Sequence, residues 1–299
     1  MAGRKLGMDF DLKDGYRMYH GHRVPGFPVH PHRGFETVTI ALDGFIDHAD
    51  SLGAKGRYGS GDVQWMTAGQ GIQHSEMFPL LDGTAGNKVE LFQIWMNLSP
   101  QAKMVKPHFT MFWRDQIPEL LTPDQKVSIR VIAGTIGGVT PLAPPPDSWA
   151  HDQGHAVGIW LVSMQAGSSY KLPGEPLPGV QRVIYAYAGS ELHLNGQRIE
   201  ANHGVAVVAS ETLKLEAKGE LKLLALQGLP IGEPVAQQGP FVMNTQAELV
   251  QAFQDFRATS FGGWPWPRPD PSHGPQGERF AVFPDGRRET PSSGPKPRK

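Results

Sequence analysis

Residues 30–39 read HPHRGFETVT, two histidines one residue apart followed by a run of β-forming residues. Alternate residues of a strand point to the same face, so His30 and His32 would project side by side, with Cα atoms about 6.6 Å apart. Two imidazoles at that separation can bind one metal ion. The alternative is that they are two polar residues at the start of a strand, with no role in metal binding.

A second pair of the same kind lies in GQGIQHSEM, residues 69–77, where His74 and Glu76 would share one face of a strand. If the two segments lie on neighbouring strands, they supply three imidazoles and one carboxylate. Such a donor set suits Fe, Mn, Co, Ni, Cu or Zn, and four ligands in an octahedral field leave two adjacent positions open for substrate or O₂.

The composition favours a protein of β strands and turns. Glycine (36 residues) and proline (27) are abundant, and charged residues make up 19%, below the roughly 25% of an average globular domain. The net charge of −1 provides no field to attract nucleic acid. Absence of cysteine excludes disulfides and thiolate metal sites. Without a secretory signal or an apolar run of about 18 residues, we expect a cytoplasmic protein with no membrane span.

Two series of short apolar segments, separated by glycine, proline, aspartate and asparagine, predict strands. The first series covers 35–42, 63–68, 88–98 and 127–134, and the second covers 157–164, 180–189, 191–200, 203–209, 213–217 and 221–228. A Pro- and Gly-rich segment after Gly134 separates them, and Asn195-Gly196 predicts a hairpin. We therefore expect an all-β fold with two sandwiches or barrels, divided into domains 1–135 and 136–240 and a C-terminal part, 241–299.

The C-terminal part contains one predicted helix, over residues 244–258, with Asn244 or Thr245 as its N-cap. Its apolar stripe consists of Leu249, Val250, Phe253 and Phe256. Beyond Ser260 the chain is rich in proline, so we expect neither ladders nor helices there. The motif WPWPRP, residues 264–269, is expected to lie extended against the body, and residues 291–299 to be disordered.

The motifs around the histidines resemble those of the pirin family, in the cupin superfamily. The resemblance rests on HPHRGFETVT (30–39), GDVQWMTAG (61–69), GIQHSE (71–76) and GPFVMNTQAEL (239–249). It implies a bicupin, two stacked β-barrels with the metal in the N-terminal barrel alone. The second series of strands agrees with this, because residues 150–230 contain no HxH or HxE pair.

Carried over to this chain, the resemblance makes His30, His32, His74 and Glu76 the ligands of one divalent transition metal. Iron is the first expectation, with Mn, Ni, Co, Cu and Zn as alternatives. Glu36 stands where other cupins place an acidic ligand, in HxHxxxE, and shares the strand parity of both histidines. Because pirins take the carboxylate from the HxE pair, we expect Glu36 to be either a buried group or a group that contacts a metal ligand.

Two further residues are expected at a substrate pocket beside the metal. Phe27 lies just before the first ligand, and Gln93 is a polar amide in an apolar strand. Such an amide needs a hydrogen-bond partner, which a substrate would supply. The neighbouring large side chains are expected to form barrel core: Trp65, Met66, Phe92 and Trp95.

The resemblance implies a metal-dependent dioxygenase similar to quercetin 2,3-dioxygenases, which would act with O₂ on a flavonol or a similar small aromatic phenol or enol. Glu76 would serve as both metal ligand and general base. The alternative is a regulatory protein, since certain pirins are metal- and redox-dependent co-regulators of transcription or modulators of a partner enzyme. A purely structural metal site is a third interpretation.

Overall fold

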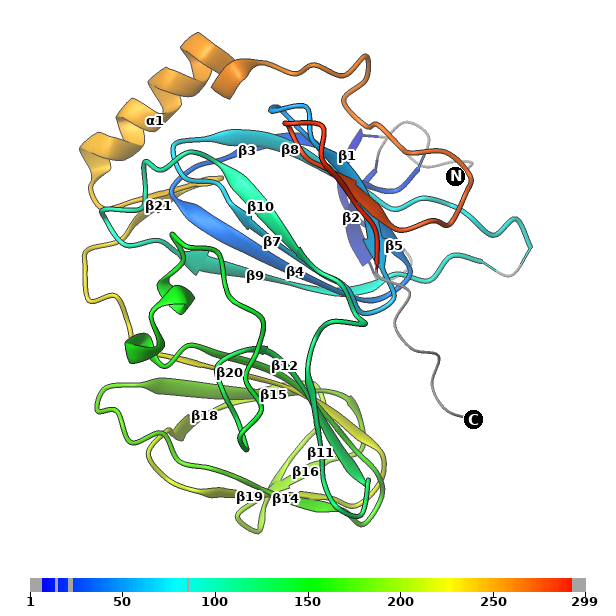
Figure 1. The fold of residues 1–299 in the computed structure, drawn as a ribbon, viewed down its shortest axis with the longest axis vertical. Helices are drawn as coiled ribbons and strands as arrows, with labels where there is room; N and C mark the ends of the chain where they lie inside the picture. Colours follow the sequence, from blue (N-terminus) through cyan, green and yellow to red (C-terminus); the bar gives the residue numbers. More distant parts are fainter. Residues whose placement is uncertain (1–6, 14–15, 21–23, 85, 292–299) are drawn as a thin grey trace. The chain divides into compact units, whose positions relative to one another are not determined.

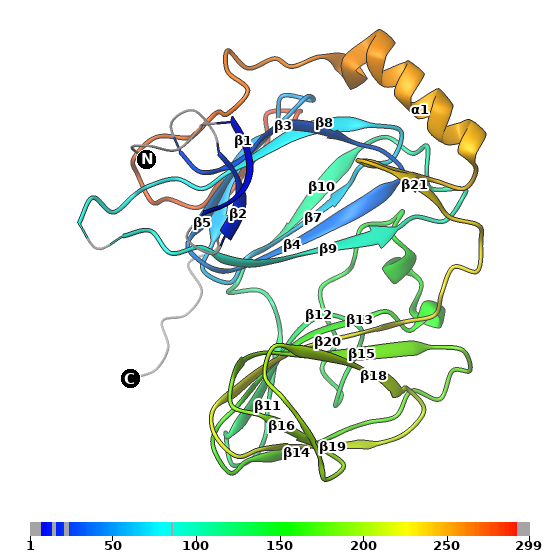
Figure 2. The same ribbon diagram turned by 180° about the vertical axis from the view of Figure 1, so that it is seen from behind.

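The computed structural model describes residues 7–13, 16–20, 24–84 and 86–291. Their regular secondary structure consists mainly of β strands, with one α-helix near the C-terminus (Figures 1 and 2). The chain divides into two compact units: unit 1 comprises Met1–Asp115 and Glu233–Lys299, and unit 2 comprises Gln116–Gly232. Each unit contains two larger antiparallel sheets, which confirms the all-β prediction.

Unit 1 is built from sheets of order β10-β7-β4-β9 and β24-β23-β6-β5-β8-β3, with the separate hairpin β1-β2. The strands that precede unit 2 are β1 (Gly7–Lys13), β2 (Tyr16–His20), β3 (Gly26–His32), β4 (Phe35–Asp43), β5 (Phe45–Asp50), β6 (Lys55–Gly59), β7 (Val63–Thr67), β8 (Ile72–Met77), β9 (Glu90–Asn97) and β10 (His108–Phe112). Both sheets contribute to one apolar core, in which Met66 of β7 and Tyr58 of β6 are fully buried. The sheets therefore pack face to face around the interior of unit 1.

Unit 2 has sheets of order β11-β12-β13-β20-β15-β18 and β14-β19-β16-β17. Its strands are β11 (Glu119–Leu121), β12 (Val127–Ala133), β13 (Gly158–Met164), β14 (Ser169–Leu172), β15 (Gln181–Gly189), β16 (Leu192–Leu194), β17 (Gln197–Ile199), β18 (His203–Val208), β19 (Leu213–Ala217) and β20 (Leu221–Gly228). Apolar side chains such as Val162, Leu215 and Leu223 fill its interior. The predicted hairpin is confirmed: Asn195 and Gly196, both at positive φ, join β16 to β17.

The boundaries of the units differ from the expected domain boundaries of 135 and 240. β12, which we expected before the linker, pairs with β13 and so belongs to unit 2. The Pro- and Gly-rich segment after Gly134 is consequently a connection between two adjacent strands of one sheet. Unit 1 resumes at Glu233, so β21 (Ala236–Gln238) also lies on the other side of the expected boundary.

The helix α1 (Gln246–Thr259) follows β21 and β22 (Phe241–Met243). Thr245 is its N-cap: the hydroxyl accepts from the Glu248 backbone N–H, and the Glu248 carboxylate accepts from the Thr245 N–H, which forms a capping box. Phe253 and Phe256 pack on Phe241 as the stripe predicted, but Val250 is 50% exposed. Within the described ranges, no helix has the length and apolar character that a membrane span requires.

Residues 264–289 form a segment that we call the C-terminal strap, drawn in orange and red in Figure 1. It contains β23 (Phe280–Val282) and β24 (Arg288–Glu289). β23 pairs with both β6 and β24, so the expectation that this part of the chain forms no ladder is wrong. Residues 280–282 contain no proline, and their backbone N–H groups are therefore available for pairing.

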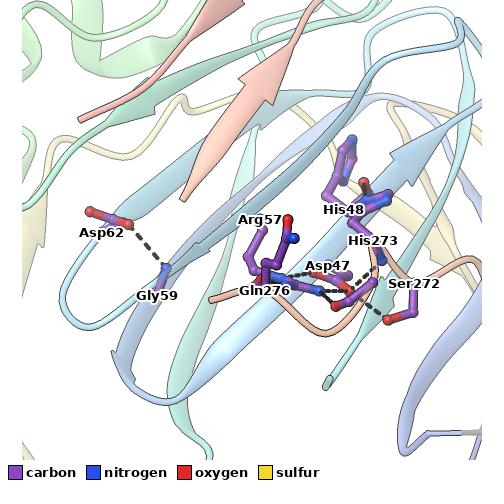
Figure 3. A network of polar contacts seen from close by, with 9 residues as sticks. Asp47, His48, Arg57, Gly59, Asp62, Ser272, His273 and Gln276 are labelled. Atoms are coloured by element: carbon purple, nitrogen blue, oxygen red, sulfur yellow. Dashed lines mark hydrogen bonds and ion pairs between the residues drawn. The ribbon is translucent and has the colours of Figure 1, made fainter. Parts of the chain in front are cut away.

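The strap contacts the N-terminal strands of unit 1, as expected for WPWPRP, although residues 266–270 are bent rather than extended. Trp266 Nε1 donates to the Asp50 carbonyl at 2.8 Å. Further along, the strap surrounds a buried ion pair between Asp47 of β5 and Arg57 of β6 (Figure 3). Of the expected disordered residues, 292–299 lie outside the described part of the chain.

Candidate metal centre

Three histidines meet in the interior of unit 1 because two of its strands pair in a particular register. His30 and His32 lie on β3, and His74 lies on β8 directly opposite His30. One ring nitrogen from each of the three lies within 4.8 Å of the others. The ring centroids of His30 and His74 are 4.4 Å apart. The two motifs that the sequence analysis paired are thus adjacent in the fold.

The hydrogen bonds of these imidazoles leave nitrogens directed at one another. His30 Nδ1 bonds to the Pro28 carbonyl at 2.8 Å, which leaves Nε2 for the cluster. Both ring nitrogens of His32 and of His74 are buried and have no hydrogen-bond partner among the described residues. Buried polar atoms without a partner are costly, and coordination to a metal ion would satisfy one nitrogen of each ring.

The electrostatics of the cluster favour neutral rings. Burial lowers the pKa of His30, and it lowers the pKa of His32 and His74 well below the ordinary histidine value. The neighbouring imidazoles lower the pKa of His32 and His74 further, because protonated rings repel one another. Neutral imidazole is the form that binds a metal. The three residues therefore fit a transition-metal site.

Glu76 lies at the edge of this cluster, two residues after His74 on β8. Its Oε2 is 3.9 Å from His74 Nε2. Thr39 of β4 donates to Oε1 at 3.4 Å, and Gln93 of β9 donates from Nε2 to both carboxylate oxygens at 2.9 Å. The structure thus brings all four expected ligand residues together, with the carboxylate held beside the three imidazoles.

Both expected pocket residues lie at the cluster. The Phe27 ring is 6.4 Å from the His30 ring, and Gln93 bonds to Glu76. Trp95, two residues after Gln93, was expected in the core, but its side chain is 44% exposed. The Trp95 ring centroid lies 5.4 Å from that of His32. An aromatic surface therefore borders the histidines and is open to solvent.

The Trp95–His32 contact occurs between β9 and β3, which are the terminal strands of their sheets. On this side, the described strands of the two sheets do not pair with one another. A terminal strand keeps some backbone groups outside the ladder and leaves space for side chains to reach solvent. The exposure of Trp95 follows from this position, which local sequence does not reveal.

Glu36 is fully buried, which is one of the two roles expected for it. It accepts a hydrogen bond from Thr67 at 2.7 Å and, by strand alternation, lies on the opposite face of β4 from Thr39, which contacts Glu76. Counting alternate residues from His32 places Glu36 on the wrong face, because Gly34, at φ +83°, interrupts the alternation of side chains between β3 and β4. Glu36 therefore does not share the face of His32.

One neighbour of the cluster was missed. His48 of β5 is fully buried, and its ring centroid lies 5.6 Å from that of His74. Its Nε2 is 3.3 Å from Asp50 Oδ2. The signal was present in the sequence, since His48 and Asp50 form an HxD pair like the HxE pair of the ligands. His48 and Asp50 thus place a histidine–carboxylate contact next to His74.

Comparisons with known proteins agree with this architecture. Residues 4–96 match the family model for pirin, and residues 159–262 match the model for the pirin C-terminal cupin domain. A "Pirin-like protein" of Caulobacter vibrioides is 38% identical over 79% of this chain and 80% of its own length. A Pseudomonas aeruginosa protein with the name "Putative quercetin 2,3-dioxygenase" is 37% identical over 79% of each chain.

Solved structures show the same fold. The crystal structure of a quercetin 2,3-dioxygenase from Acinetobacter baumannii matches with a TM-score of 0.73 and 31% identity and covers 83% of each chain. That of a bacterial pirin from Escherichia coli, in complex with nickel(II), covers 69% of this chain and 76% of its own with a TM-score of 0.50 and 20% identity. With its matches to both domain models and its curated relatives, this chain belongs to the pirin family of bicupin proteins.

Proposed function

We propose that this protein is a metal-dependent dioxygenase of the quercetin 2,3-dioxygenase type, which acts on a flavonol or a similar phenol or enol. The observation that carries the proposal is the cluster of three imidazoles, with His32 and His74 buried and His30 partly buried, which has a carboxylate at its edge and an exposed aromatic side chain beside it. The names of the Pseudomonas relative and the Acinetobacter structure support this reaction class.

His30, His32, His74 and Glu76 would hold one divalent metal in unit 1, with iron as the first expectation and Mn, Ni, Co, Cu and Zn as alternatives. When bound, the metal supplies Lewis acidity toward the substrate hydroxyl and a place for O₂. The relative that was crystallised with nickel(II) supports a divalent ion. Unit 2 would carry no metal, as the resemblance to pirins implies; residues 150–230 contain no HxH or HxE pair.

The remaining steps belong to the side chains. Glu76 would accept the proton of the substrate hydroxyl as a general base. The rings of Phe27 and Trp95, which flank the histidines on two sides, would contact an aromatic substrate. In the overall reaction, one flavonol and one O₂ give one depside and one carbon monoxide, so both oxygen atoms of O₂ appear in the products.

The test begins with protein stripped of metal and restored separately with each of the six divalent ions. Flavonol absorbance, O₂ uptake and carbon monoxide release are then followed under air. We expect equal molar consumption of flavonol and O₂ with at least one metal, and no consumption by a His74→Gln control. Absence of turnover with every metal and several flavonols would overturn the proposal, and co-purification of a protein partner would then favour the regulatory alternative.

A further inference from the structure

We propose that Gln93, oriented by Trp95, is a positioning residue that restricts Glu76 to binding a metal through one carboxylate oxygen. The inference rests on the metal centre of the proposed function but does not depend on which substrate is used. It assigns a role to two residues of β9 that lie outside the ligand motifs. Three contacts between described side chains carry it.

The first contact fixes the orientation of the Gln93 amide. The indole Nε1–H of Trp95 can only donate a hydrogen bond, and it donates to Gln93 Oε1 at 3.1 Å. The amide NH₂ must therefore face the other way, toward Glu76. The opposite orientation of the amide would direct its N–H at the indole N–H and its oxygen at the carboxylate oxygens. Phe35 supports the indole, since the two ring centroids lie 4.4 Å apart.

The second and third contacts place the amide nitrogen between the two oxygens of Glu76. Gln93 Nε2 lies 2.9 Å from Oε1 and 2.9 Å from Oε2. It therefore lies on the plane that bisects the carboxylate. A chelating metal ion would have to lie on this same plane, because it must also be nearly equidistant from both oxygens, and the amide nitrogen is held there by a further bond to Thr39 Oγ1 at 3.2 Å. With Gln93 in place, the carboxylate can offer a metal only the outer side of one oxygen.

The position of the imidazoles identifies that oxygen. Oε2 lies 3.9 Å from His74 Nε2, whereas Oε1 accepts the additional bond from Thr39. We infer that Oε2 faces the metal and that Oε1 remains as the proton acceptor. A monodentate Glu76 with three imidazoles leaves two positions of an octahedral set, whereas a bidentate Glu76 leaves one. A reaction that requires both substrate and O₂ at the metal needs the former.

The test uses cobalt(II) alone as the probe, bound to metal-free wild type and to three variants. Gln93→Leu removes the amide, and Trp95→Phe keeps a ring but removes the indole N–H. Gln64→Leu is the matched control: Gln64 lies opposite Thr39 on β7, just as Gln93 lies opposite Thr39 on β9, and is 2% exposed. Crystal structures give the two cobalt–oxygen distances to Glu76, which distinguish binding through one oxygen from binding through both.

We expect monodentate Glu76 in wild type and in Gln64→Leu. In Gln93→Leu the two cobalt–oxygen distances should become nearly equal, and Trp95→Phe should shift in the same direction by less. Bidentate Glu76 in the wild type, unchanged coordination in Gln93→Leu, or no cobalt at the histidines would overturn the inference. The cobalt–oxygen distances do not depend on flavonol turnover, so they test this inference even if the proposed reaction is not observed.

Discussion

The contact between the C-terminal strap and the remainder of unit 1 should depend strongly on one buried carboxylate, that of Asp47. This side chain is fully buried and accepts from Arg57 Nε at 2.6 Å and Arg57 Nη2 at 2.7 Å. It also accepts from the Ser272 hydroxyl at 2.7 Å and the His273 backbone N–H at 2.8 Å, both in the strap (Figure 3). Asp47→Ala removes all four acceptor contacts at once.

The loss of stability in Asp47→Ala follows from the contacts that are left to Arg57. Arg57 is also fully buried, and after the substitution only strap carbonyls, those of Gly274 and Gln276, are left to accept from it. Removal of one partner of a buried ion pair costs about 3–5 kcal/mol. At about 2–4 °C per kcal/mol for a unit of this size, the melting temperature of unit 1 should fall by about 6–20 °C.

Thermal unfolding followed by circular dichroism measures this change, and limited trypsin digestion reports release of the strap through cleavage after Arg279, which is followed by Phe280. Ser272→Ala is the control, because it removes one hydrogen bond and should cost only about 0.5–1.5 kcal/mol. The double variant Asp47→Leu/Arg57→Met should recover part of the loss, since no charge is left unpaired. If Asp47→Ala cost no more than Ser272→Ala, the ion pair would not hold the strap.

Three other substitutions test separate parts of unit 1. Lys103→Met should lower the free energy of unfolding by about 3 kcal/mol in urea titrations, because Lys103 Nζ donates to three acceptors in a buried position. Burial lowers the pKa of Lys103 from 10.5 to about 8. Between these pH values the unfolded chain binds more protons than the folded chain, so the free energy of unfolding should rise with pH. This rise should be smaller in Lys103→Met. Thr245→Ala should lower the free energy of unfolding by about 1 kcal/mol through loss of the N-cap. An unchanged urea midpoint would refute this prediction. Because burial lowers the pKa of His74, metal-free protein should lose stability as pH falls below about 6.5, and His74→Phe should reduce that loss.

Much of the fold could be predicted from local patterns. Strand alternation, the Asn195-Gly196 turn and the Thr245 capping box each depend on residues close in sequence, and the structure contains all three elements. The division into units could not be found in this way. The Pro- and Gly-rich segment after Gly134 has the composition of a linker, but long-range pairing of β12 with β13 decides its role.

The metal site, too, could be predicted from local patterns only in part. His30, His32, His74 and Glu76 could be proposed because alternation places each pair on one face, and the β3–β8 register then brings the pairs together. Burial of Glu36 could be predicted, but not the face of β4 on which it lies, because Gly34, at φ +83°, interrupts the alternation of side chains between His32 and Glu36.

The exposure of Trp95 depends on which strands are terminal in their sheets, and that is a property of the whole topology. The pairing of β23 with β6 likewise joins segments more than 200 residues apart in sequence, at a distance where composition alone gave the wrong expectation. Gln93 could be linked to the site as a polar residue in an apolar strand, but its bonds to Trp95 and Glu76 could not be predicted.

The metal centre itself is tested most directly by equilibrium dialysis and elemental analysis of the wild type, His74→Gln, Glu76→Gln and Glu36→Gln after exposure to each candidate metal. We predict one tightly bound ion per wild-type chain, retention in Glu36→Gln, weakened binding in Glu76→Gln and loss in His74→Gln. A wild type that binds none of the six metals stoichiometrically, a His74→Gln protein that keeps its ion, or loss of the ion in Glu36→Gln alone would contradict the assignment.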